Sequence, residues 1–253
     1  MGQRAFGDLR VRIPSGRNEG AWWSVAALGR GYGSGRFGRD RLDALAAVTR
    51  PGDALWDIGA HKGFVTLAAS RMVGPLGVVV SIEPALDNLR FLERHVEWNQ
   101  LRNVRVVSFA ASDEVGVSTI GGRGSSVAFR LGEGSQEVEV RPIELLAVEL
   151  DLGRPTVLKV DVEGEEAAVL RGAKRLLGTD QAILVSTHSR ELYEECRAFL
   201  EPIGFRIYDS WQIAKHREAG TPWSSDHDML AIGFDRPVEQ ERIRALRLIS
   251  GPK

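Results

Sequence analysis

From residue 54 onward, short apolar runs alternate with amphipathic helical segments. Runs rich in valine, isoleucine and leucine predict strands at 54–58, 77–82, 104–109, 156–160, 182–185, 205–208 and 229–234. Between the strands, apolar residues recur at spacings of three and four, which places them on one buried helical stripe, as in Leu86, Leu89, Leu92 and Val96. Strands that alternate with helices in this way form a parallel sheet with helices on both faces. We therefore predict an α/β fold with a doubly wound, mostly parallel, seven-stranded sheet.

Two segments depart from this alternation. Residues 115–140 alternate polar and apolar positions around glycine-rich turns, which predicts a β-hairpin insertion at the edge of the sheet. The first fifty residues contain several aromatic side chains, Tyr32 among them, between many glycines and arginines. We interpret residues 1–50 as an N-terminal cap over the active site and residues 51–253 as one domain, a length that a single core can organise.

The charge of the chain narrows the range of partners. Lysines and arginines number 33 and aspartates and glutamates 34, interspersed along the chain, so the sequence lacks the basic surface that nucleic acids select. Neither a signal peptide nor an apolar run long enough to cross a bilayer is visible. Cys196 is the only cysteine, which excludes an internal disulfide and a multi-thiolate zinc site. We expect a cytoplasmic protein that binds neither nucleic acid nor membrane, and the sequence leaves its oligomeric state open.

Charged side chains stand at or just after the ends of four predicted strands: Asp57, Glu83, Asp161 and His188. In open α/β sheets, ligands bind at the carboxyl ends of the strands, where the strand order reverses. We therefore expect these four side chains around one binding site. A carboxylate in the position of Glu83 can accept both hydroxyls of a ribose, which indicates a nucleoside-containing ligand.

The turn after the first strand indicates which nucleoside ligand binds. Gly59 and Gly63 allow a tight turn that a ligand can approach closely, with Ala60 and Phe64 in the same segment and Asp57 beside it. A dinucleotide carries a pyrophosphate, which the carboxylate repels, whereas S-adenosylmethionine carries an ammonium and a sulfonium. The further glycine of the dinucleotide fingerprint G-x-G-x-x-G is also missing. The sequence therefore favours the methyl donor.

Three segments resemble the FkbM family of methyltransferases. They are Trp56-Asp57-Ile58-Gly59-Ala60-His61-Lys62-Gly63-Phe64, Ile82-Glu83-Pro84, and Leu158-Lys159-Val160-Asp161-Val162-Glu163-Gly164-Glu165-Glu166 with Leu170-Arg171-Gly172-Ala173. The resemblance spans residues 52–204 and implies a class I, Rossmann-like methyltransferase. It further implies that S-adenosylmethionine methylates hydroxyls of sugars or polyketide-type natural products. Two positions depart from the family pattern: His61 replaces a frequent asparagine, and Ser186 replaces a glutamate that commonly precedes the histidine matching His188.

The resemblance, together with the turn, assigns a set of donor-binding residues. They are Asp57, Gly59, Ala60, Gly63, Phe64, Glu83, Ala110 and Asp161. Many class I enzymes hold the adenine with an acidic residue where Ala110 and Ala111 stand here. We expect backbone contacts with the adenine at this point, or a contact from Asp113.

Transfer to an oxygen calls for a group that accepts the proton of the hydroxyl, because an alcohol is a poor nucleophile while protonated. His188 is the first candidate, since imidazole titrates near neutral pH, and His227 is the second. Asp161 is expected near the reacting methyl group, where it orients the acceptor, and Glu163 lies next along the same edge. These two carboxylates could instead hold a divalent metal ion such as magnesium, but we favour a site without a metal.

Other functions share parts of this pattern. An N-methyltransferase for a small amine fits the same fold, and a nicotinamide-dependent oxidoreductase shares the ribose-binding carboxylate. A nucleoside-binding module without turnover and a methyltransferase for protein or RNA are further alternatives. Four tryptophans are candidates for an aromatic acceptor pocket: Trp22, Trp23, Trp211 and Trp223. The sequence as a whole favours an O-methyltransferase with a small-molecule acceptor.

Overall fold

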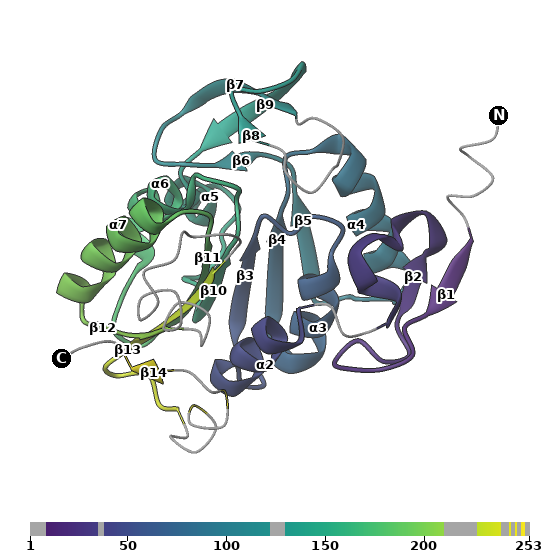
Figure 1. Cartoon of the computed structure of the whole chain (residues 1–253), viewed down its shortest axis with the longest axis horizontal. Coiled ribbons are helices and arrows are strands. Elements are labelled where there is room, and N and C mark those ends of the chain that lie inside the picture. The colour runs from purple at the N-terminus through teal and green to yellow at the C-terminus, as the bar shows by residue number, and fades with distance from the viewer. Residues whose placement is uncertain are drawn as a thin grey trace.

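The structure is a computed structural model that describes residues 9–34, 38–121, 130–209 and 227–238, together with residues 243, 246, 249 and 250. Its central sheet consists of β3 (Ala54–Ile58), β4 (Val78–Ile82), β5 (Val104–Val107), β10 (Val157–Val160), β11 (Ala182–Thr187), β12 (Phe205–Asp209), β13 (His227–Gly233) and β14 (Ile249–Ser250). In space the strands lie in the order β14-β12-β13-β11-β10-β3-β4-β5 (Figure 1).

Most of this sheet is parallel. Strands β5, β4, β3, β10 and β11 run in the same direction, and β13 runs antiparallel to its neighbours β11 and β12. The predicted seven-stranded, mostly parallel sheet is therefore confirmed, and the two-residue β14 adds a short eighth strand at one edge. From β3 the chain proceeds to β4 and β5 on one side and returns to β10 on the other, so the strand order reverses between β3 and β10.

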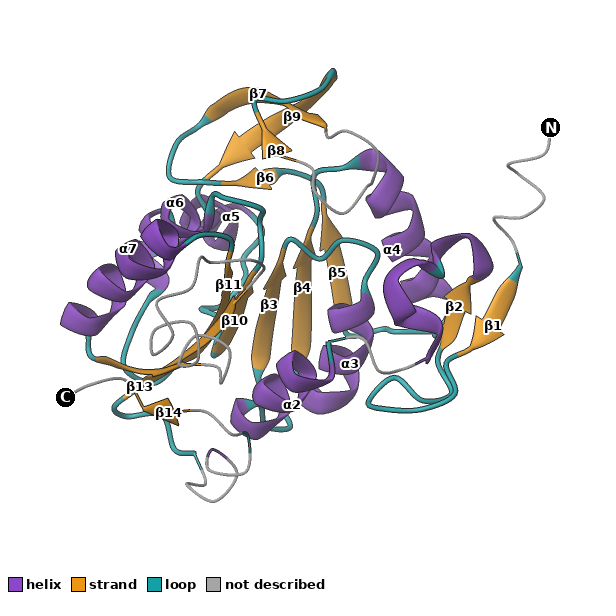
Figure 2. Cartoon of the chain, in the orientation of Figure 1, coloured by secondary structure: helices purple, strands orange, loops and turns teal. Residues whose placement is uncertain are grey.

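Helices cover both faces of the sheet (Figure 2). They are α2 (Arg39–Val48), α3 (Phe64–Val73), α4 (Leu86–Trp98), α5 (Ile143–Glu149), α6 (Glu166–Arg171) and α7 (Arg190–Leu200), with short 3-10 helices η1 (Val25–Ala27), η2 (Gly29–Ser34), η3 (Lys174–Leu176) and η4 (Glu201–Ile203). In β3, Trp56 and Ile58 pack with side chains of α5, α6 and α7, whereas Leu55 packs with α2 and α3. Because successive side chains of a strand point to opposite faces, Asp57 shares the face of Leu55. Among the described residues, every helix is too short or too polar to span a lipid bilayer.

Helix α7 illustrates how local sequence sets an element. The Ser189 hydroxyl accepts a hydrogen bond from the backbone N–H of Leu192 at 3.1 Å, which caps the first turn. The buried face includes Tyr193 and Cys196, and Gly204 ends the segment with a φ of 108°. Burial raises the pKa of the Cys196 thiol to about 12, so this cysteine is a core residue and not a nucleophile.

The insertion forms a sheet of its own. Its strands are β6 (Ala110–Ala111), β7 (Gly116–Gly121), β8 (Arg130–Leu131) and β9 (Gln136–Arg141), in the order β6-β9-β7-β8. The predicted antiparallel pairing exists between β7 and β9, but the predicted place at the edge of the central sheet is wrong. Strand β6 directs the chain away from β5 by pairing with β9, so the second sheet lies beyond the carboxyl ends of β3, β4 and β5 (Figure 1).

The N-terminal segment packs against α3 and α4. Its strands β1 (Arg10–Arg12) and β2 (Trp22–Ser24) form an antiparallel pair. Trp23 is fully buried and stacks on His95 with 3.9 Å between ring centroids. The guanidinium groups of Arg10 and Arg12 instead lie over the ring of Trp22, with their Cζ atoms 4.4 and 3.8 Å from the ring centroid. Neither tryptophan lines the cleft described below, which corrects the expected aromatic pocket; Trp211 and Trp223 lie outside the described residues.

Candidate active site

A cleft opens at the carboxyl ends of β3, β4 and β10, where the strand order reverses. It encloses about 1110 Å³ of empty space, open solvent included. Seven of the predicted site residues line it: Gly59, Ala60, Phe64, Glu83, Ala110, Asp161 and Glu163. Asp57, Gly63 and His188 do not line this cleft.

The turn after β3 requires glycine for reasons of packing. Gly59 has a φ of 74°, and a Cβ at this position would lie 1.9 Å from the carbonyl oxygen of Asp161. Gly63 has a φ of 88°, and its Cβ would lie 2.7 Å from the side chain of Leu92. The turn is thus pressed against β10 on one side and α4 on the other, so both glycines fix its shape.

A buried lysine that sequence analysis did not single out supports this turn. The Lys159 ammonium is 2% exposed and donates hydrogen bonds to the carbonyl oxygens of Gly59 at 2.7 Å and Ile58 at 3.2 Å. It also lies 3.0 Å from the Asp57 carboxylate, which is itself fully buried and accepts a hydrogen bond from the Thr66 hydroxyl at 2.7 Å. Asp57 therefore lies behind the turn, where its carboxylate contacts Lys159 and not the cleft. This position does not fit the expected direct contact with the ligand. The sequence does contain a signal for this role, because Lys159 is the one charged residue in the otherwise apolar strand β10.

Glu83 keeps its predicted place at the end of β4. One carboxylate oxygen accepts a hydrogen bond from the backbone N–H of His61 at 2.8 Å, and the other accepts from Ala85 at 3.0 Å and from the side chain of Asn88 at 3.2 Å. Burial raises the pKa of Glu83 above its usual value, although these hydrogen bonds oppose the change. The carboxylate is held rigidly at the wall of the cleft, as ribose recognition requires.

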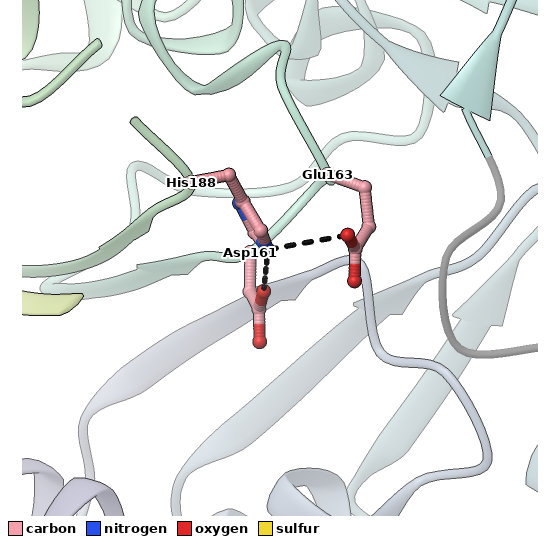
Figure 3. A group of neighbouring side chains, drawn as sticks. All are labelled: Asp161, Glu163 and His188. Atoms are coloured by element: carbon pink, nitrogen blue, oxygen red, sulfur yellow. Dashed lines mark ion pairs between the residues drawn. The ribbon is translucent and has the colours of Figure 1, made fainter. Parts of the chain in front are cut away.

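One end of the cleft is acidic, and the carboxylates of Asp161 and Glu163 there contact the imidazole of His188 (Figure 3). His188 follows β11, and its Nε2 lies 3.3 Å from Glu163 and 3.8 Å from Asp161. Its Nδ1 lies 2.7 Å from the carboxylate of Glu166, which is fully buried at the start of α6. Asp161, Glu163 and His188 thus lie together, as expected from their places at the carboxyl ends of the strands. The contact of Glu166 with the imidazole was not predicted.

The charge of His188 bears on its expected role. Burial by itself lowers the pKa of the imidazole, but the hydrogen bonds and charges of Glu163 and Glu166 outweigh it and raise the pKa to about 10. His188 therefore carries a proton at neutral pH in this arrangement. The role of His188 as a proton acceptor stays a prediction. This role requires that the imidazole loses its proton when the donor and the acceptor bind.

An arginine of the N-terminal segment closes this end of the cleft. Arg41 on α2 lies 2.6 Å from Oδ2 of Asp161 and 3.1 Å from Oδ1 of Asp228 on β13. Asp228 also accepts a hydrogen bond from the hydroxyl of its strand partner Ser186 at 2.6 Å. Ser186 stands where the family commonly has a glutamate, and Asp228 of the neighbouring strand places a carboxylate beside it. The side chain of His227, the second candidate base, lies outside the described residues.

The comparison with protein families identifies the catalytic module. The model of the methyltransferase FkbM domain matches residues 57–207, more than half of the chain. The chain belongs to the FkbM methyltransferase family. No curated protein matches its sequence.

Several solved structures are similar to this chain. The FkbM methyltransferase of Methylobacillus flagellatus KT has 19% identity and a TM-score of 0.51, over 73% of this chain and 48% of that chain. The precorrin-6y C5,15-methyltransferase of Geobacter metallireducens GS-15 has 16% identity and a TM-score of 0.49, over 76% and 87% of the two chains. Fibrillarin of Aeropyrum pernix, solved with bound S-adenosyl-L-methionine, has 19% identity and a TM-score of 0.49, over 75% and 73%. This chain spans about half the length of the FkbM structure that it resembles.

Membership of the FkbM family makes the chain an S-adenosylmethionine-dependent methyltransferase. The cleft is compatible with this donor: its wall contains the Glu83 carboxylate, and Ile82, Phe109 and Ala110 add apolar surface suited to an adenine. The acidic end suits a sulfonium. The expected alternative contact from Asp113 does not fit, because Asp113 pairs with Arg171 at 2.6 Å and does not line the cleft. The nicotinamide oxidoreductase and the module without turnover are thereby set aside.

Proposed function

We propose that this FkbM-family enzyme methylates a hydroxyl oxygen of a small acceptor, a sugar or another natural product. The observation that carries the proposal is the group of Asp161, Glu163 and His188 at the acidic end of the cleft. An amine needs less help to attack a methyl sulfonium than a hydroxyl, which is a poor nucleophile until a partner accepts its proton. A cleft with proton-handling side chains at one end therefore suits an oxygen acceptor best.

The residues have distinct tasks in the transfer. The bound donor supplies an electrophilic methyl carbon. The acceptor oxygen attacks that carbon, and the carbon–sulfur bond breaks with its electron pair on sulfur. The hydroxyl proton passes to Nε2 of His188, after that nitrogen has released its own proton to solvent. Asp161 orients the acceptor, because Arg41 and Lys159 hold its carboxylate ionised and lower its pKa despite the opposing effect of burial. The cleft walls exclude water and align the reactants, which is the larger part of catalysis in a displacement of this kind.

The charges favour a small acceptor over a nucleic acid. Asp161 and Glu163 line the acidic end of the cleft. Asp228 lies next to them and shares the guanidinium of Arg41 with Asp161. A phosphate backbone would meet net repulsion there. We also propose a cytoplasmic location; it is supported by the lone, buried Cys196, which leaves no possible internal disulfide.

The test is a transfer assay with labelled donor and matched acceptors. Hydroxylated sugars and macrolides are compared with their amino analogues, which test the alternative of N-methylation. We expect transfer to hydroxyls, and we expect His188→Ala to lower turnover by about 100-fold or more while donor affinity stays within about threefold. Glu133→Gln, in an exposed turn, serves as the control. Preferential methylation of the amines, or near-normal turnover of His188→Ala on hydroxyls, would refute the proposal.

A further inference from the structure

The side chains of Asp161, Glu163 and His188 meet at one point although they come from two different strand ends. Asp161 and Glu163 follow β10, and His188 follows β11. Each offers one potential ligand atom, and these atoms all lie within 4.8 Å of one another. Magnesium and calcium bind their ligands at about 2.0–2.6 Å, so two ligands of one ion are at most about 5 Å apart. The three atoms therefore already have the spacing of ligands around one ion.

The imidazole is oriented for such a role. Glu166 binds Nδ1 of His188 at 2.7 Å from behind, and this directs Nε2 toward Asp161 and Glu163. Glu166 is itself fixed, because it is fully buried and accepts a hydrogen bond from the backbone N–H of Gly164 at 3.0 Å. Histidines that bind metals generally donate their other ring nitrogen to a carboxylate in this way.

Asp161 divides its two oxygens between different partners. Arg41 pairs with Oδ2 at 2.6 Å, and Lys159 lies 3.8 Å from the same oxygen. Oδ1 is the atom that faces Nε2 of His188. The arginine and the lysine therefore hold the carboxylate without covering the oxygen that an ion would use.

We infer that Asp161, Glu163 and His188 bind one divalent transition-metal cation of the manganese type. This inference rests on the proposed function and deepens it, and it departs from the sequence-based preference for a site without a metal, which considered the two carboxylates alone. Two carboxylate oxygens suit a hard cation and an imidazole nitrogen suits a transition metal, so manganese fits this mixed set better than magnesium or a soft metal. Three protein ligands leave open positions, and Asp161 and Glu163 line the donor cleft, so those positions face the acceptor.

Such an ion would help a hydroxyl to lose its proton. An acceptor oxygen bound to the cation would be more acidic, and its proton would pass to solvent water as the oxygen attacks the methyl carbon. His188 would then act as a ligand of the ion and not as the proton acceptor.

The experiment measures the binding of Mn²⁺ alone to the purified full-length chain. Electron paramagnetic resonance reports the loss of free Mn²⁺, and calorimetry gives the affinity. We expect one ion per chain, at least about tenfold weaker binding in Glu163→Gln, and about 10- to 100-fold weaker binding in Glu166→Gln. Glu133→Gln, an exposed carboxylate of the insertion, should bind Mn²⁺ as the wild type does. Circular dichroism and donor calorimetry show whether each variant is folded.

The outcomes separate this inference from the proposed function. A folded chain that binds the donor but no Mn²⁺, or that methylates hydroxyls at full rate in excess chelator, overturns the metal site and leaves the proposed function intact. Binding of Mn²⁺ that Glu163→Gln does not weaken also overturns it. Tight binding of Mn²⁺ with transfer to amines alone overturns the proposed function and keeps the metal site.

Discussion

The buried ion pair of Lys159 and Asp57 determines how single substitutions behave in this site. Both side chains are at most 2% exposed. An ion pair of this kind contributes little relative to apolar residues of similar size, but the removal of one partner leaves an uncompensated buried charge. Lys159 also donates hydrogen bonds to the carbonyl oxygens of Ile58 and Gly59, where the turn after β3 begins. Stability and donor binding are therefore linked at this pair.

We predict that Lys159→Met lowers the free energy of unfolding by about 3–5 kcal/mol, because it isolates the Asp57 carboxylate in the core. The double variant Asp57→Asn with Lys159→Met should regain a large part of that loss. Urea denaturation measures all three proteins. Equal stability of Lys159→Met and wild type would show that the pair is not buried as described. By the same reasoning Asp57→Ala should lose stability as well as donor affinity, although the sequence alone placed Asp57 only among the donor-binding residues.

Glu83 offers a second test at the scale of the residue. Glu83→Gln keeps the size of the side chain but removes the charge that a ribose hydroxyl would meet. A hydrogen bond to a charged group contributes about 1.5–3 kcal/mol, so donor affinity should fall by about 10- to 150-fold. Calorimetry with S-adenosylmethionine measures the change, and Glu133→Gln is the matched control. Unchanged affinity would remove Glu83 from the donor site.

The contact between β2 and α4 depends on one neutral histidine. His95 is fully buried; its Nδ1 donates to the carbonyl oxygen of Lys62 at 2.7 Å, and its Nε2 accepts from the backbone N–H of Ser24 at 3.0 Å. Burial, opposed by the bond to Lys62, lowers the pKa of His95 from 6.5 to about 4. A proton on Nε2 would break the bond to β2, so the N-terminal segment requires the neutral ring.

This contact predicts acid sensitivity. Between pH 6.5 and about 4 the unfolded chain binds a proton at His95 that the folded chain does not, so stability falls as the pH falls through this window. The loss should reach about 3 kcal/mol near pH 4. Urea denaturation at several pH values measures the slope, and His95→Gln should show a smaller one. Equal slopes for wild type and variant would contradict the assignment.

At the scale of elements, the sequence predicted what depends on local periodicity. The five parallel strands and α4 and α7 follow from apolar spacing that each segment carries by itself. The place of the insertion did not follow, because β6 is two residues long and its pairing with β9 is a contact distant in sequence. Asp161, Glu163, His188 and Glu83 followed from the strand-end rule. Arg41 and Asp228 did not, because their contacts join α2 and β13 to β10 across the whole chain.

At the scale of the whole molecule, the N-terminal segment is part of one hydrophobic core. Ile13, Trp23 and Tyr32 pack with Phe64 and Leu67 of α3. We predict that removal of residues 1–38 exposes this face, so that the shortened chain unfolds at lower temperature and binds a hydrophobic dye. Calorimetry and dye fluorescence test this. A shortened chain that melts as the full chain does would support residues 51–253 as an independent domain.

Arg41 joins two parts of the chain that lie on either side of the family-wide segment, residues 57–207. Exchange of that segment with a relative would transplant the donor turn, Glu83 and the acidic group as one unit. It would leave behind Arg41 and Asp228, the two side chains that fasten Asp161 and Ser186 from outside. Chimeric enzymes built at these boundaries should therefore take the donor-binding residues from one parent and Arg41 and Asp228 from the other. Their acceptor preference should then depend on how well these two sets of residues fit together.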